Sequence, residues 1–192
     1  GLPSLNEEQK ALCKRVMAFL TDQGMIFAYF KKLAAYADIP GDIMVIKDHI
    51  NLFPEHPLHG PNIEELGTRF PDMSNAYDKK LIALSDNIGE SLALNLKKGV
   101  YVGTQGPTFE TLSEYRYFRI IGGDAVGMST VPEVIVANHG SMSVFGVSVI
   151  SNVGCDANLS NVTHEEVQEN TLLAQERLAT LFTEMVKAID KL

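Results

Sequence analysis

Apolar residues recur at helical spacing through the first part of the chain. Ser4 and Glu7 have the spacing of a capping box, and apolar positions three and four residues apart then continue to Gly24. The same spacing returns over Met25–Ala37. The pattern predicts a helical hairpin over residues 1–38, and we recognise no relative of this segment.

Short β-branched runs alternate with amphipathic stretches from residue 42 onward. The runs predict strands at Ile43–Ile46, Gly99–Gly103, Ala125–Met128 and Val144–Ile150. The amphipathic stretches predict helices at Lys79–Asn95, Thr111–Ile121, Pro132–His139 and about His164–Lys191. Pro and His residues indicate a loop over Asn51–Asn62. This alternation predicts an α/β fold, in which helices flank a mixed, largely parallel sheet that follows the N-terminal hairpin.

Length and charge narrow the class of protein. The 192 residues are enough for one sizeable core and too few for two ordinary domains. Lys and Arg total 16 against 24 Asp and Glu, which gives a formal net charge of −8. Because the basic residues are spread out and the net charge is negative, the composition disfavours nucleic acid as a partner.

The cysteines and the apolar runs bear on location. Cys13 and Cys155 are too few for a disulfide framework and lack the spacing of metal ligands. We find no secretory leader pattern at the start and no apolar run long enough to span a bilayer. We therefore expect a cytoplasmic protein that does not associate with membranes.

The run from Gly99 to Glu133 places polar groups in loops at the ends of two predicted strands. Gly103, Gly106 and Pro107 interrupt the first strand and leave Phe109 and Glu110 together at its end. An aromatic ring beside a carboxylate suits a flat heterocycle. The alternative for Glu110 is a structural role, as an acid near the start of the following helix.

Several motifs resemble those of the homotrimeric class of purine nucleoside phosphorylases. They are GPTFET at Gly106–Thr111, DAVGMSTVPE at Asp124–Glu133 and RFPDMSNAYD at Arg69–Asp78, in the family's order. The resemblance covers about residues 38–192 and makes 39–192 the C-terminal part of a phosphorylase-like domain. It implies phosphorolysis of purine nucleosides such as inosine and guanosine, with inorganic phosphate as co-substrate, no cofactor, and assembly as a homotrimer.

Three residues are candidates for recognition of the base. Glu110 can accept a hydrogen bond from a protonated purine nitrogen, Phe109 can lie against the ring, and the Asn152 amide can both donate and accept. The resemblance assigns the same three positions to the base and implies that Asn152 stabilises negative charge on the departing purine. We therefore take Glu110 and Asn152 as candidate catalytic residues. Together they imply that the site prefers 6-oxopurines as substrates.

The resemblance also implies residues for the ribose. It places Tyr101 and Met128 beside the sugar and His164 beside the 5′-hydroxyl. Each has a structural alternative, since Met128 could belong to the core, Tyr101 could be an ordinary strand residue, and His164 could only begin the last helix.

Fewer residues match the family's phosphate site. Ser129 is the one matching phosphate ligand, because the family's Gly-rich loop, Arg-x-His motif and Asn-Ala-Ala-Gly-Gly-like loop have no counterpart before Gly41.

The resemblance also makes Phe53 the candidate aromatic residue that closes a neighbouring subunit's pocket. Two hypotheses stay open: an active phosphorylase, and a truncated or fused protein without turnover that at most binds a purine base or nucleoside.

Three histidines lie close together in the sequence. His49, His56 and His59 fall within eleven positions, but no Cys or carboxylate completes a ligand set with regular spacing. We therefore expect no metal site.

Overall fold

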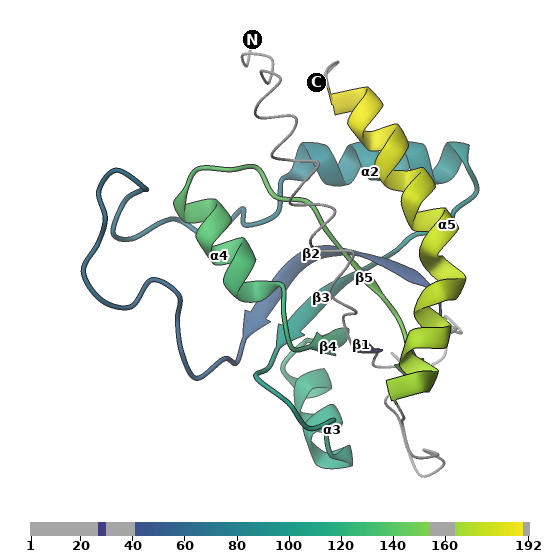
Figure 1. Ribbon diagram of the computed structural model, residues 1–192, viewed down its shortest axis with the longest axis horizontal. Helices are drawn as coiled ribbons and strands as arrows, with labels where there is room; N and C mark the ends of the chain where they lie inside the picture. Colours follow the sequence, from purple (N-terminus) through teal and green to yellow (C-terminus); the bar gives the residue numbers. More distant parts are fainter. Residues whose placement is uncertain (1–26, 30–40, 154–163, 190–192) are drawn as a thin grey trace.

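The computed structural model describes residues 27–29, 41–153 and 164–189, and Figure 1 shows their arrangement. Within these ranges the chain forms six strands and four helices. The strands are β1 Phe27–Tyr29, β2 Ile43–Asn51, β3 Lys97–Gly103, β4 Ala125–Gly127, β5 Gly146–Val149 and β6 Asn152–Val153. The helices are α2 Lys79–Ser91, α3 Leu112–Ile120, α4 Val131–His139 and α5 His164–Ile189. Helices surround the strands, with α2 and α5 crossing at one end of the sheet (Figure 1).

The sheet is mixed, and its strand order is β5-β2-β3-β4-β1-β6. Strand β3 pairs in parallel with both β2 and β4, and β1 pairs in parallel with β6. The β2–β5 and β1–β4 pairs are antiparallel. This confirms the predicted α/β class with a mixed, largely parallel sheet.

The sheet curls on itself. Strands β5 and β6 stand at opposite ends of the strand order, yet only Ile150 and Ser151 separate them along the chain. Three Cα steps span at most about 11 Å. Five strand spacings in a flat sheet would cover roughly 24 Å. The two edges therefore have to approach each other, which gives the sheet the shape of a partly closed barrel.

Strand β2 is longer than its apolar run. Ile43–Ile46 is fully buried, as a four-residue apolar run predicts, and pairs with both β3 and β5. A register shift between Ile46 and Asp48 marks a bulge. Beyond it the strand continues to Asn51 on β3 alone. The predicted strand was too short because Asp48 and His49 lie where one face is half-exposed and polar residues are tolerated.

Local capping sets where two of the helices begin. Thr111 caps α3 in a reciprocal capping box with Glu114, and Asp78 caps α2 by accepting from the backbone N–H groups of Lys80 and Leu81. Among the described residues, no helix is both long enough and apolar enough to cross a bilayer.

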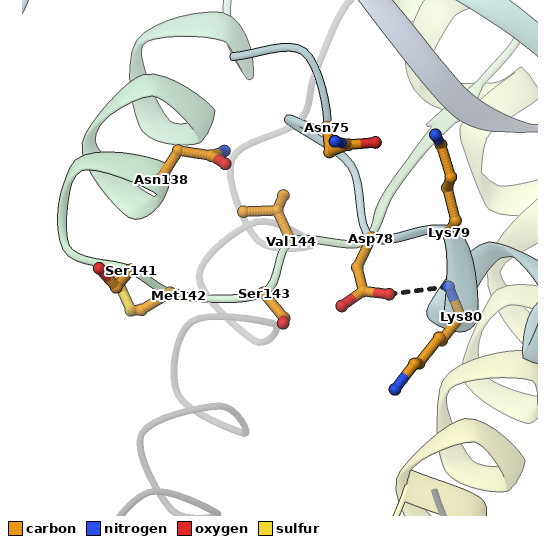
Figure 2. Close-up of a pocket in the computed structure, with 9 residues that line it drawn as sticks. All are labelled: Asn75, Asp78, Lys79, Lys80, Asn138, Ser141, Met142, Ser143 and Val144. Atoms are coloured by element: carbon orange, nitrogen blue, oxygen red, sulfur yellow. Dashed lines mark hydrogen bonds between the residues drawn. The ribbon is translucent and has the colours of Figure 1, made fainter. Parts of the chain in front are cut away.

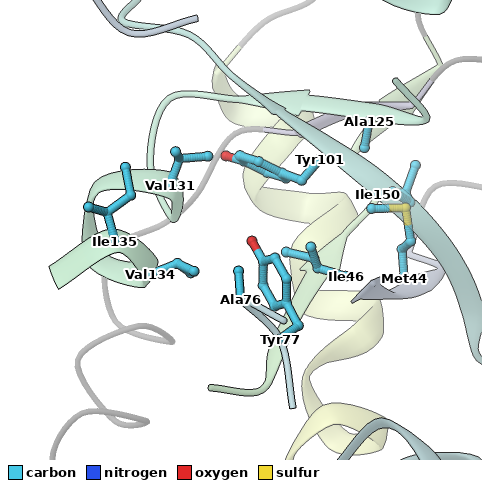
Figure 3. Packing of buried hydrophobic residues seen from close by; sticks show 10 residues of the cluster. All are labelled: Met44, Ile46, Ala76, Tyr77, Tyr101, Ala125, Val131, Val134, Ile135 and Ile150. Atoms are coloured by element: carbon cyan, nitrogen blue, oxygen red, sulfur yellow. The ribbon is translucent and has the colours of Figure 1, made fainter. Parts of the chain in front are cut away.

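The largest buried cluster joins the sheet to α4, and Figure 3 shows it from close by. It contains apolar side chains from strands β2, β3 and β4, from α4, from the segment before α2 and from the residue after β5: Met44, Ile46, Ala76, Tyr77, Tyr101, Ala125, Val131, Val134, Ile135 and Ile150. A second cluster packs α3 on β3 and β4, and a third packs α5 on α2 and β5. The site described below lies between the first two clusters.

The predicted N-terminal hairpin is wrong at one segment. Phe27–Tyr29, placed in a helix by the apolar spacing, forms β1 between β4 and β6. Pairing with strands on both sides outweighs a weak helical preference, and aromatic residues suit a strand. The rest of the hairpin lies outside the described residues. Strand β6 is the other element that the apolar pattern did not predict, since two residues carry no periodicity.

Candidate active site at the carboxyl end of the sheet

Three parallel strands end side by side. Asn51 of β2 lies opposite Gly103 of β3, and Gly103 lies opposite Gly127 of β4. The loops that follow these strands start at the same edge of the sheet, where open α/β sheets usually bind ligands. This edge therefore gathers Phe53, the segment 104–110 and the segment 128–130.

Close packing joins the β3 loop to the β4 loop. Gly106 adopts a positive φ of 66°, and a Cβ added there would lie 2.2 Å from the Sδ atom of Met128. A side chain at this position would be strained by the positive φ and would displace Met128, and glycine avoids both costs. Met128 therefore lies directly against the loop that carries Phe109 and Glu110, both half-buried.

The Glu110 carboxyl group is held from the first turn of α3. The phenol of Tyr115 donates to Oε2 of Glu110 over 3.1 Å. Burial raises the pKa of Glu110, the residue's own backbone N–H and the Tyr115 phenol lower it in part, and the Glu114 carboxylate raises it. Thr111 and Glu114 form the capping box of this helix, so Glu110 is not one of its capping residues.

Thr130 follows the second loop in a strained conformation. Thr130 has a φ of 70° and a ψ of −55°, and the Val131 N–H donates to the Ser129 carbonyl over 2.7 Å. This geometry is a γ-turn of the rare class. A β-branched residue at positive φ costs about 1–3 kcal/mol. Strain of this kind concentrates at functional sites, and here it sets the position of Ser129.

Tyr101 supports this turn through hydrogen bonds to its phenol oxygen. Its phenol oxygen accepts the Ser129 backbone N–H over 3.4 Å, and the Ser129 and Thr130 hydroxyls also bond to it. The side chain is completely buried, and burial raises the pKa of Tyr101 to about 12 despite these bonds. A direct contact of this phenol with ribose stays a prediction, while its contact with the Ser129 turn is observed.

A second buried phenol lies beside the first. The hydroxyl of Tyr77 contacts Nδ1 of His49 at 3.1 Å, and His49 lies opposite Tyr101 in the β2–β3 register. Burial lowers the pKa of His49, and the Asp48 carboxylate opposes this. Figure 3 shows both tyrosine side chains between the sheet and α4. The His49 ring is thus a packing partner in the fold.

Phe53 contributes to the core of its own chain. A Cβ added to Gly103 would lie 2.7 Å from Cε2 of Phe53 and 2.6 Å from Cγ2 of Val131, so both side chains press on this glycine. Phe53 is half-buried in the cluster that contains Tyr101. Closure of a neighbouring subunit's pocket by Phe53 stays a prediction.

Two candidate residues lie on other elements, and one of them is level with the end of β4. Asn152 is in β6, opposite Ala28 of β1, which in turn lies opposite Val126, so one strand separates Asn152 from β4. His164 is the first residue of α5, after a segment outside the described residues. The structure thus brings together Phe109, Glu110, Met128 and Ser129, and places Asn152 and His164 on other elements.

A polar pocket of about 380 Å³ lies elsewhere, between the start of α2 and the end of α4 (Figure 2). Asn138 and Ser141 line one side, and Asp78 and Lys80 line the other. Since α4 has nine residues at 1.5 Å each, the pocket is roughly 13 Å along the helix from the Thr130 turn. None of its lining residues is a candidate site residue.

The three histidines of the sequence cluster have different surroundings. The rings of His56 and His59 lie 5.7 Å apart, while His49 faces Tyr77. In the part of the chain that the structure describes, no group of three or more His, Cys, Asp or Glu side chains could hold a metal ion.

Two residues of the site were missed in the sequence. Tyr115 comes five positions after Glu110, a spacing that carries no helical signal because the helix begins only at Leu112. Thr130 resembles an ordinary N-cap from its type, and only the backbone shows that its side chain does not cap the helix.

The family model of the phosphorylase superfamily matches residues 36–187. The chain belongs to the phosphorylase superfamily. It is 50% identical over 150 residues to purine nucleoside phosphorylase 1 of Geobacillus stearothermophilus, a match that covers 78% of this chain and 53% of that protein. It is 45% identical over 156 residues to the purine nucleoside phosphorylase of Rattus norvegicus, covering 78% and 54%.

Solved structures of this superfamily share the fold. The Schistosoma mansoni purine nucleoside phosphorylase in complex with inosine superposes with a TM-score of 0.75 at 35% identity, covering 87% of this chain and 59% of that one. A Schistosoma purine nucleoside phosphorylase in complex with guanosine gives 0.71 at 38% identity, covering 76% and 55%. The chain spans about half the length of the curated relatives it matches.

Proposed function

We propose that this chain is a purine nucleoside phosphorylase, which converts purine ribonucleosides and deoxyribonucleosides such as inosine and guanosine to free base and (deoxy)ribose 1-phosphate. One observation carries the proposal. A partly buried carboxyl group, Glu110, follows Phe109 on the β3 loop, and this loop packs against Met128, next to the Ser129 turn, at the edge where three strands end. Relatives at 45–50% identity are purine nucleoside phosphorylases.

The proposed reaction breaks the C1′–N9 bond while a phosphate oxygen forms a bond to C1′. The electron pair of the broken bond moves onto the purine, and an oxocarbenium-like ribosyl centre develops between base and phosphate. Glu110 would accept the N1–H of a 6-oxopurine, and Asn152 would stabilise the negative charge on the departing ring. No cofactor is part of this proposal, since phosphate itself is the second substrate.

Ser129 would bind phosphate in this scheme. Its hydroxyl lies 3.3 Å from that of Thr130, at the N-terminus of α4, where the helix dipole favours an anion. Met128 would form the floor under the ribose, and His164 would reach the 5′-hydroxyl.

We also propose that residues 39–192 are the C-terminal part of a phosphorylase-like domain and that the protein assembles as a homotrimer, acting in cytoplasmic purine salvage. Exposed apolar side chains of the long β2–α2 loop support a subunit contact: Ile63, Leu66 and Phe70. Light scattering of the purified protein would give the mass of three chains, whereas the mass of one chain would contradict this part.

The second candidate function is binding of a purine base or nucleoside without turnover. Relatives at 45–50% identity support the first function over this alternative. Hypoxanthine release from inosine, with and without phosphate, separates the two. The proposal expects phosphate-dependent release that falls sharply in Glu110→Ala and Asn152→Ala, while the exposed α2 variants Glu90→Ala and Asn87→Ala serve as controls and keep the activity. Hypoxanthine binding without release at any phosphate concentration would favour the second function.

A further inference from the structure

Tyr115 is a buried phenol that reaches the candidate base-binding carboxylate. It is 4% exposed and packs with Val102, Phe118 and Val126 in the cluster that joins α3 to the sheet. Packing against these side chains fixes the ring, so the hydroxyl meets Glu110 at a set position, with 3.1 Å between the two oxygen atoms. Glu110 itself lies on a loop, before the helix begins.

The other groups around the carboxyl do not replace this bond. Among the described residues, those that act on Glu110 are its own backbone N–H, the Tyr115 phenol and the Glu114 carboxylate. Glu114 repels a negative charge on Glu110, and its own oxygen is engaged with the Thr111 N–H. Tyr115 is therefore the one side-chain donor among these groups.

A donor in this place controls what the carboxyl can bind. A carboxylate accepts only, whereas a neutral carboxyl also donates through its O–H. A 6-oxopurine presents a protonated N1 and needs an acceptor, while a 6-aminopurine presents a bare N1 and needs a donor. A carboxylate with about four lone-pair sites keeps room for the N1–H after accepting from Tyr115 and from its own backbone.

We propose that Tyr115 is a specificity-determining positioning residue, which holds Glu110 as an oriented, ionised acceptor so that the site takes 6-oxopurines and rejects 6-aminopurines. This inference rests on the proposed function. Tyr115 touches no substrate in this scheme and acts only through Glu110. Burial, which favours the neutral carboxyl, works in the opposite direction, so removal of the phenol hydroxyl weakens the selection.

The test compares Tyr115→Phe with Tyr117→Phe, which removes a phenol hydroxyl from a half-exposed position on the same helix. With saturating phosphate, kcat/KM for inosine and for adenosine is measured across the pH range in which the protein stays folded. For Tyr115→Phe we expect about a tenfold loss with inosine at neutral pH. The inosine-to-adenosine ratio should fall, and the acid limb of the inosine profile should move to higher pH. Tyr117→Phe should match the wild type.

Two outcomes overturn the inference. One is a Tyr115→Phe protein that keeps both the ratio and the acid limb, even with a lower Tm. The other is equal effects of both variants. A second readout needs no turnover: a carbon-13 NMR titration of the Glu110 carboxyl, assigned by its loss in Glu110→Gln, should show a higher pKa in Tyr115→Phe. If the wild type releases no hypoxanthine, the proposed function fails, and this titration still decides whether Tyr115 sets the ionisation of Glu110.

Discussion

The backbone N–H of Ser129 donates to the phenol oxygen of Tyr101, with 3.4 Å between nitrogen and oxygen. This bond ties the residue that follows β4 to a fully buried side chain in the middle of β3. The Tyr101 phenol also supports the strained Thr130 turn, since the Thr130 hydroxyl bonds to it. A rigid strand thereby positions the proposed phosphate ligand.

Tyr101→Phe should raise the KM for phosphate by at least about two- to tenfold, the range for one lost hydrogen bond, because the Ser129 N–H and two hydroxyls lose their partner. The base-binding side should change little, so hypoxanthine affinity should stay near the wild-type value. Tyr77→Phe is the matched control, because it also removes a buried phenol hydroxyl but loses a bond to His49. Steady-state kinetics at varied phosphate concentration measures the KM for phosphate in both variants. An equal rise of this KM in Tyr101→Phe and Tyr77→Phe would contradict the prediction.

Gly103→Ala should destabilise the fold by about 1–3 kcal/mol, the usual cost of overpacking. The added Cβ would lie 2.6 Å from Val131 and 2.7 Å from Phe53, and both belong to the packed core. Gly140→Ala is the control, since its nearest new neighbour is 3.6 Å away and its φ is −81°. Urea unfolding measures both, and a Gly103→Ala protein as stable as Gly140→Ala would refute the packing argument.

Glu110→Gln should raise the Tm at neutral pH while it weakens inosine binding. Burial raises the pKa of Glu110 in the folded protein, so the wild type loses stability as the pH rises through that value. Gln has no charge to bury. At a pH below the ordinary carboxyl pKa the two proteins should therefore have the same Tm. The difference between their Tm values should grow as the pH increases. Thermal melts over a pH series, with exposed Glu90→Gln as control, test this. A Glu110→Gln protein that melts lower at neutral pH would show the opposite sign.

Asn62→Ala should release the long loop before α2 from α4. The Asn62 side chain bridges Nε2 of His139, at 3.2 Å, and the carbonyl oxygen of Gly67, at 3.0 Å. Its loss should cost about 1 kcal/mol locally and speed tryptic cleavage at the exposed Arg69. Asn87→Ala on α2 is the control. Timed digestion followed by mass spectrometry reads the result, and unchanged cleavage at Arg69 would mean that other contacts hold the loop.

The sequence predicted the elements that bury a continuous face. The apolar run at Ile43–Ile46 and the breaks at Gly103 and Gly106 correspond to a buried strand and to a loop that faces the candidate site. The predicted helix end at His139 is also confirmed, since α4 ends there. Local pattern was enough for these positions because burial and turn chemistry decide them.

Other features depend on contacts between distant segments. Strand β1 exists because β4 and β6 pair with it, which helical spacing over Met25–Ala37 cannot reveal. The Thr130 turn depends on Tyr101, 29 positions earlier along the chain, so residue type alone suggests an ordinary cap. The role assigned to Ser129 came from motif resemblance alone, since a single hydroxyl in a loop carries no local signal for phosphate.

Phosphorus-31 NMR of the purified chain, incubated with inosine and inorganic phosphate, tests the central claim most directly. The proposed function predicts a ribose 1-phosphate signal that grows in step with free hypoxanthine and is absent without phosphate or in Glu110→Ala. No new phosphorus signal from folded wild-type protein, or release of hypoxanthine with free ribose in place of the sugar phosphate, would contradict it.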